Sequence, residues 1–224
     1  MSKIKIPKYS LSEEIINAIS HGVGALLSIA GLVILIVMAV SHHNTMAVVT
    51  CSIYGAILII LYTISCIYHS LSPNLTAKKV LRVIDHCNVY LLVAGTYTPI
   101  MLVCFHDILG WTIFGIVWTI TIIGIVLTCI DIDKYQMASV ACHLMAGWAI
   151  ILAIKELIAK MSPICLEFLI IGGVAYSLGS ILYVIGSKKK YMHSIFHFFV
   201  LAGSIFQYFT ILLAIWVIRL FFYR

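Results

Sequence analysis

The sequence predicts an all-α membrane protein: a bundle of seven transmembrane helices in a single domain over residues 1–224. Three observations predict this class, namely the composition, the lengths of the apolar runs and the placement of the basic residues. Hydrophobic residues make up 63% of the chain, charged residues 10%, and the mean hydropathy is +1.14. A soluble domain is about half apolar and a quarter charged. We therefore expect a multi-pass protein of the cell membrane.

Seven apolar runs are long enough to cross the hydrocarbon core of a bilayer, for which a helix needs about 20 residues. Their approximate bounds are 22–41, 46–69, 83–105, 109–130, 136–157, 164–186 and 193–218. The connectors between them are short and carry turn-forming and charged residues, as in SLSPNLTAKK and GSKKKYM. No segment indicates a second domain or a soluble insertion.

The basic residues fall unequally on the two sides of this predicted bundle. One side holds ten: Lys3, Lys5, Lys8, Lys78, Lys79, Arg82, Lys134, Lys188, Lys189 and Lys190. The other side holds four: Lys155, Lys160, Arg219 and Arg224. Because cytoplasmic loops carry the excess of Lys and Arg, the amino terminus is expected inside and the carboxyl terminus outside. The formal charge of +6 thus reflects topology, and nucleic acid is not an expected partner.

A short N-terminal interfacial helix is expected before the first span. The stretch SLSEEIINAIS offers Ser10 or Ser12 as a helix cap, followed by acidic residues in the first turn. Isoleucines recur on one stripe after these acids. This pattern is typical of an amphipathic helix that lies at the inner membrane interface.

Ionisable residues converge at the predicted cytoplasmic ends of several spans. His193 and His197 open the seventh span, His69 closes the second, and Asp85 opens the third. Ionisable groups within membrane segments are costly, and they mark functional sites by default. The convergence of these four residues at one depth therefore predicts a site. Two further histidines lie toward the same face, in the first and fifth spans: His21 and His143.

The spacing of these residues fits a metal site. His193 and His197 are four residues apart, which places their Cβ atoms about 5–6 Å apart on one helix face. Ser65 and His69 repeat this spacing. Three imidazoles leave a fourth position for water, which is the pattern of a catalytic zinc rather than a structural one. Such a water has its pKa lowered to about 7 and becomes a nucleophile, with Asp85 as the candidate acceptor of its proton.

Each of these residues also has a structural alternative. A histidine pair at this spacing arises by chance, and His69 could be an interfacial histidine bonded to a carbonyl. Asp85 could instead cap a helix and pair with Arg82. His86 points about 100° away from Asp85 around the helix, so it is expected to be structural.

At these residues the sequence resembles the hemolysin III family, within the wider group that contains adiponectin and progestin receptors and alkaline ceramidases. The matching stretches are EEIINAISHGVGALLSIAG (13–31), SCIYHSL (65–71), LRVIDHCNVYLLVAGTYTPIML (81–102) and HSIFHFFVLAGSI (193–205). They occur in the expected order and spacing. The resemblance covers essentially the whole chain.

The resemblance implies a zinc ion near the cytoplasmic face, held by His69, His193 and His197. It also implies that Asp85 holds the zinc-bound water and that Ser65 orients the water or a substrate carbonyl. By the same resemblance, the residues that match the family's first motif would support the metal ligands or lie at the interface. These residues are Glu13, Glu14, Asn17 and His21. One departure is Gln207, where relatives often carry a histidine.

Three functions remain open at this point. The leading one is a zinc-dependent hydrolase of membrane-lipid amides or esters, serving lipid homeostasis, with Asp85 as base and then acid. The second is a pore-forming cytolysin, although a pore needs polar lining over its whole depth and the outer halves of the spans are nearly all apolar. The third is a receptor or sensor that binds zinc without turnover, since it needs the same ligands.

Overall fold

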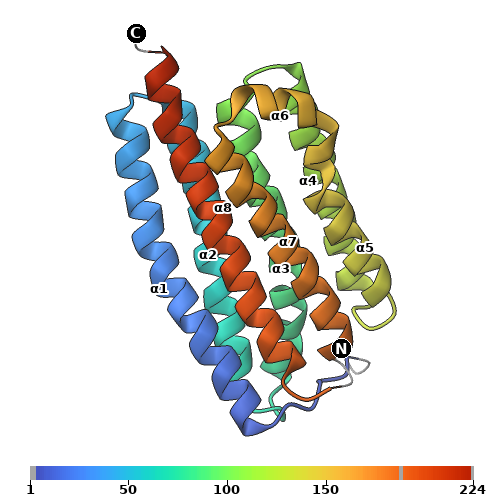
Figure 1. Cartoon of the computed structure of the whole chain (residues 1–224). Coiled ribbons are helices and arrows are strands. Elements are labelled where there is room, and N and C mark those ends of the chain that lie inside the picture. The colour runs from blue at the N-terminus through green and yellow to red at the C-terminus, as the bar shows by residue number, and fades with distance from the viewer. Residues whose placement is uncertain (1–3, 187–188, 223–224) are drawn as a thin grey trace.

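The protein forms a helical bundle whose long helices run roughly alongside one another (Figure 1). The computed structural model describes residues 4–186 and 189–222, with side chains up to Trp216. The elements in this part of the chain are α1 (Leu11–Ser41), α2 (Thr45–Ser70), α3 (Thr76–Cys104), α4 (Ile108–Ile130), α5 (Gln136–Gly147), the 3-10 helix η1 (Ala149–Ala153), α6 (Ile154–Lys160), α7 (Pro163–Gly186) and α8 (Met192–Phe222). The two chain ends lie at opposite ends of the bundle.

The described residues contain seven helical segments that are long and apolar enough to cross a membrane, as predicted. The predicted fold class is confirmed, while the orientation of the termini stays a prediction. Lys3, Lys188 and Arg224, which entered the charge argument, lie outside the described residues, as does the side chain of Arg219. The third helix begins at Thr76, earlier than the predicted 83, so Lys78 and Arg82 are parts of that helix.

The prediction of a separate interfacial helix was wrong, because α1 continues without a break into the first span. Ser10 is the cap: its Oγ accepts from the Glu13 amide, and its own amide donates to Glu13 Oε2 over 2.8 Å. The polar side of the first turns of α1 faces the bundle instead of water, since Asn17 and His21 are buried, whereas Ile19 is 62% exposed. The polar side chains point into the bundle and the isoleucines point outward, where lipid would contact them.

The third helix is the centre of the bundle. In an apolar stretch of 18 residues within α3, 72% of the residues are buried, whereas in the corresponding stretch of α7 only 11% are buried. Large apolar side chains such as Leu26, Val33 and Ile122 are exposed on the outer helices. Apolar residues on the outside and polar ones inside are what a bilayer favours, because lipid tails are as apolar as the side chains that face them.

The predicted fifth span, 136–157, is broken into α5, η1 and α6. The hydroxyl of Tyr97 in α3 lies at this break, donating to the Gly147 carbonyl and accepting from the Ile150 amide, both over 2.8 Å. Backbone groups in a membrane must be satisfied within the protein. Tyr97 therefore makes the interruption possible at this depth.

Candidate metal centre

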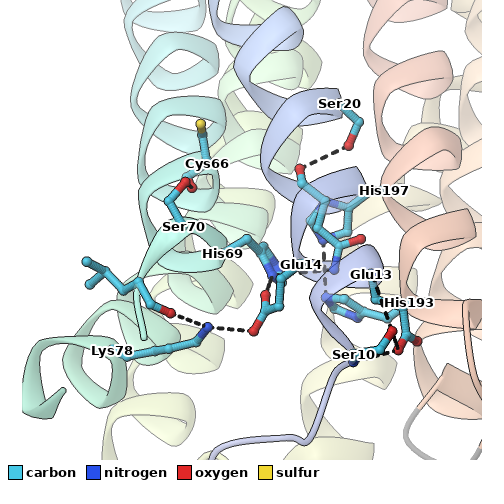
Figure 2. Close-up of polar contacts among 12 residues, drawn as sticks. Ser10, Glu13, Glu14, Ser20, Cys66, His69, Ser70, Lys78, His193 and His197 are labelled. Carbon is cyan, nitrogen blue, oxygen red and sulfur yellow. Dashed lines mark hydrogen bonds and ion pairs between the residues drawn. The ribbon is translucent and has the colours of Figure 1, made fainter. Parts of the chain in front are cut away.

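Three histidines from two helices meet at the end of the bundle that holds the amino-terminal segment. Figure 2 shows His69 on α2 facing His193 and His197 on α8. Their candidate ligand atoms all lie within 4.8 Å of one another, and the residues are 3%, 4% and 1% exposed. The structure thus brings together the three histidines that the sequence analysis selected; metal binding by them stays a prediction.

The pair on α8 has the separation that a shared ion would require. The Nε2 atoms of His193 and His197 are 3.1 Å apart. Zinc–nitrogen bonds of about 2.0–2.1 Å at a tetrahedral angle place two ligand atoms about 3.3 Å apart. Two neutral imidazoles facing each other in this way can share only one proton, so at least one of these nitrogens offers a lone pair. The geometry fits a cation bound between them.

His69 is oriented by a carboxylate on α1. Its Nδ1 donates to Glu14 Oε2 over 2.6 Å, so in the neutral ring the proton lies on Nδ1 and Nε2 carries the lone pair. This Nε2 is buried and has no hydrogen-bond partner. Metal-binding histidines almost always have their second nitrogen held by a carboxylate, carbonyl or water. His69 already has this arrangement.

Glu14 is itself fixed by a buried lysine. Lys78 Nζ donates to Glu14 Oε1 over 2.5 Å and to the Leu71 carbonyl over 2.8 Å. A chain of contacts therefore runs from α3 through Glu14 to the His69 ring (Figure 2). The sequence analysis placed Glu14 in a supporting or interfacial role and counted Lys78 only toward topology, so it missed this connection.

The donor set of this cluster fits zinc. Imidazole nitrogens are ligands that zinc prefers. Besides His69 Nε2, further buried polar atoms near the cluster lack a hydrogen-bond partner, among them His197 Nδ1 and Ser65 Oγ. Buried polar atoms without partners are costly, and a bound ion with its water is one way to satisfy them. The residues present therefore fit a zinc ion.

Asp85 and Ser65 lie beside the histidines. Asp85 lines a small cavity of about 50 Å³ together with His193. Ser65 lies one helical turn before His69 on α2, and its buried hydroxyl has no hydrogen-bond partner. Asp85 is well inside α3, and Arg82 pairs with Asp133 over 2.9 Å. The alternative that Asp85 caps a helix and pairs with Arg82 is wrong.

The remaining histidines make other contacts. His86 Nδ1 donates to the Arg82 carbonyl over 2.7 Å and its Nε2 lies 3.0 Å from the Tyr183 hydroxyl, so both ring nitrogens have a partner, while its structural role stays a prediction. His143 stacks on Tyr90 with ring centroids 3.6 Å apart and is not part of the cluster. His21 stacks on His197 at 3.8 Å, and both of its nitrogens lack a partner.

Two other residues of the matching stretches can be placed. Asn17 Nδ2 lies 3.4 Å from His69 Nδ1, so it lies against the same ring as Glu14. Gln207 donates from Nε2 to the Leu169 carbonyl over 3.0 Å, deeper along α8. The departure at Gln207 therefore lies away from the three histidines.

The segment before α1 covers the cluster. Tyr9 stacks on His193 with ring centroids 4.8 Å apart and an interplanar angle of 17°. Burial of the Tyr9 ring raises the pKa of its hydroxyl above the usual value. Arg82 Nη1 donates to the Lys5 carbonyl over 2.6 Å, which holds this segment in place. No motif in the sequence indicated that Tyr9 would contact the site.

Three cavities share lining residues with one another, and His193 of the cluster lines two of them. A polar vestibule of about 600 Å³ is lined in part by the amino-terminal segment and by His193. The small cavity at Asp85 shares His86, Tyr183 and His193 with it. An apolar cavity of about 330 Å³ continues beyond, sharing His143 and Phe196 with the small one.

The fold and the site define a class: a multi-pass membrane protein of seven apolar helices with a buried histidine cluster at one end. The chain belongs to the haemolysin-III-related family, whose sequence profile matches residues 9–208.

Several relatives support this assignment. The chain is 40% identical to "Hemolysin-3" of Bacillus cereus over 90% of this chain and 91% of that protein. It is 39% identical to "Hemolysin-3 homolog" of Bacillus subtilis (strain 168) over 91% and 95%, respectively. A more distant relative is "Monocyte to macrophage differentiation factor" of Homo sapiens, 24% identical over 73% of this chain and 69% of that protein.

Proposed function

We propose that the protein is a zinc-dependent hydrolase of amide or ester bonds in membrane lipids. The observation that carries the proposal is the small cavity lined by Asp85 and His193, which shares lining residues with a polar vestibule and with an apolar cavity. A lipid has a polar head, a carbonyl and an apolar chain in that order. The three cavities offer matching environments in the same order.

Bound zinc would supply a Lewis acid that polarises a carbonyl oxygen and makes water a better nucleophile. His69, His193 and His197 would hold the ion, with the His69 ring fixed by Glu14. These ligands leave room for one more, as in other catalytic zinc sites.

Asp85 would act first as the general base and then as the general acid. It would accept a proton from the attacking water and return it to the departing amine or alcohol, as a carboxylate does in general acid–base catalysis. A C–O bond from water forms at the carbonyl carbon, and the C–N or C–O bond to the leaving group breaks. The Ser65 hydroxyl, which has no partner, would donate a hydrogen bond to the water or the carbonyl.

The apolar cavity would hold part of the acyl chain. Its lining includes Leu92, Ile100, Leu169 and Val200, and its volume of about 330 Å³ lies within the usual range of ligand pockets. Because it adjoins the small cavity at Asp85, a chain placed there would leave its carbonyl at the level of the histidines.

The test is hydrolysis by the purified, zinc-loaded protein in detergent, with free fatty acid measured by mass spectrometry. The substrates are a panel of amide-linked and ester-linked membrane lipids. Asp85→Asn should lower the rate about 10²–10⁴-fold. The matched control is Asp107→Asn, a carboxylate in the Asp107–Lys160 pair on the opposite end of the bundle. Release that is equal in both variants, or that survives removal of zinc, would contradict the proposal.

Cytolysis is a second candidate, and the name "Hemolysin-3" of the Bacillus cereus relative favours it. Lysis of erythrocytes by the purified protein would test it. Lysis that persists after loss of all three histidines would support pore formation over hydrolysis. A zinc-bound protein without hydrolysis of any panel lipid would instead favour a receptor or sensor.

A further inference from the structure

The polar vestibule beside the histidine cluster is strongly basic. Five basic residues line it: Lys5, Lys8, Arg82, Lys189 and Lys190. Two carboxylates accompany them, Glu13 and Asp133. The balance is an excess of positive charge inside a concave surface, where such charge attracts anions more strongly than on a flat one.

Both carboxylates of the vestibule are already engaged. Glu13 accepts from the amides of Ser10 and Tyr191, over 2.8 Å and 2.7 Å. Asp133 accepts from Arg82 Nη2 over 2.9 Å and from the Lys5 amide over 3.3 Å.

The lysine ammonium groups, by contrast, are not neutralised by carboxylates. Among the residues that the structure describes, Lys5, Lys8, Lys189 and Lys190 form no ion pair through their side chains. Four cations therefore remain available in the vestibule.

Arg82 adds a buried donor to these lysines. It is 7% exposed, and its Nη1 and Nη2 atoms are bonded to the Lys5 carbonyl and to Asp133. Its Nε is buried and has no hydrogen-bond partner. An unsatisfied buried donor on a charged group is costly. Guanidinium groups are well suited to bind phosphate and carboxylate oxygens, so an anionic oxygen would satisfy this Nε.

The vestibule adjoins the candidate metal centre at His193. His193 lines both the vestibule and the small cavity that contains Asp85. A group bound among the basic residues would therefore lie next to the histidines, on the side opposite to the apolar cavity.

We propose that this vestibule binds an anionic, phosphate-type group, and that the lipid processed at the histidine site carries such a headgroup. The assignment of an anionic headgroup to the hydrolysed lipid rests on the proposed function, whereas binding of the anion does not. A headgroup phosphate among the basic residues, the carbonyl at His193 and Asp85, and a chain in the apolar cavity would use all three cavities at once.

A competing explanation is that these basic residues only contribute to membrane topology. That explanation predicts that any two lysines at this end of the bundle are equivalent. The test variant is Lys5→Gln/Lys190→Gln, which removes two vestibule charges and keeps the backbone contacts of Lys5. The matched control is Lys79→Gln/Lys134→Gln, which removes two charges at the same end but outside the vestibule lining.

The experiment measures thermal unfolding of the purified protein in a neutral detergent during titration with three probes. These are dioctanoyl phosphatidic acid, dioctanoyl phosphatidylcholine and inorganic phosphate at matched ionic strength. We expect phosphatidic acid to stabilise the wild type at lower concentration than phosphatidylcholine. The vestibule variant should bind phosphatidic acid about tenfold more weakly or worse, because each basic residue near an anionic lipid contributes about a factor of five. The control variant should bind as the wild type does.

The possible results separate the two parts of the proposal. Equal stabilisation by the two lipids, or equal weakening in both variants, would overturn it. Inorganic phosphate that stabilises as well as phosphatidic acid would support an anion site but overturn its assignment to a lipid. The same titration on metal-free protein measures lipid binding separately from hydrolysis. Retained binding there, with no hydrolysis of any panel lipid by the zinc-loaded protein, would overturn the proposed function and leave the anion site standing. Hydrolysis of neutral lipids alone would overturn only the assignment of an anionic headgroup to the processed lipid.

Discussion

Glu14 on α1 and His69 on α2 are joined by a hydrogen bond of 2.6 Å between the carboxylate and the ring Nδ1. This contact determines which ring nitrogen faces the other two histidines. It links the first motif of the chain to the second, and through Lys78 it reaches the third helix.

Replacing Glu14 by Gln should weaken zinc binding by about 10–100-fold, the usual effect of losing such a supporting partner. Zinc affinity is measured by competition with a chelator of known affinity. Glu13→Gln is the matched control, because Glu13 is the partner of Ser10 in the capping box of α1 and Gln serves in the same motif. Equal affinities in the two variants would contradict the role given to Glu14.

The Glu14 variant leaves Lys78 buried without its carboxylate partner, which destabilises the fold on its own account. The double variant Glu14→Gln/Lys78→Met removes both charges and so separates the two effects. It should recover thermal stability relative to Glu14→Gln while zinc binding stays weak. Recovery of zinc binding together with stability would mean that Glu14 acts only through the fold.

His193→Ala and His197→Ala, singly or together, should abolish the binding of zinc, which we expect at about one ion per chain in the wild type. Elemental analysis of protein purified without chelators makes the measurement. His143→Ala is the control, since His143 is a buried ring outside the cluster. Wild-type protein that contains no zinc, or an alanine variant that still binds zinc, would contradict the prediction of a metal centre.

Tyr97→Phe should lower the free energy of unfolding by about 1–3 kcal/mol, because it leaves backbone groups of Gly147 and Ile150 without a partner in an apolar setting. Thermal unfolding in detergent provides the comparison. Tyr208→Phe removes a single bond to the Gly31 carbonyl and should have a smaller effect. A larger loss of stability in Tyr208→Phe than in Tyr97→Phe would argue against the role of Tyr97 at the break between α5 and α6.

Gly24→Ala should destabilise the packing of α1 on α2. A Cβ at Gly24 would lie 2.8 Å from Tyr62 Cδ1, closer than the two carbons can approach. Gly115→Ala is the matched control, since nothing lies within 4 Å of its added Cβ, and alanine favours a helix by about 1 kcal/mol over glycine. Stability should fall for the first variant and hold or rise for the second. Equal changes would show that α1 can shift away from Tyr62.

The helices and the candidate site were predictable to different degrees. Apolar runs and short connectors predicted the seven spans, and the His193–His197 spacing predicted a shared helix face. The prediction of a separate interfacial helix was wrong, since an amphipathic pattern does not state whether its polar face meets water or protein. In a bilayer, the polar face of α1 turns inward.

The sequence by itself determined that this is a seven-helix membrane protein and which histidines are candidates for a shared site. Hydropathy and helical spacing are local properties, so short windows of sequence contain them. The tertiary structure alone decided that Glu14 holds His69, that Tyr9 covers His193, and that Tyr97 supports the broken fifth span. Each of these contacts joins residues far apart in the chain. Their geometry depends on how whole helices pack, which no local pattern specifies.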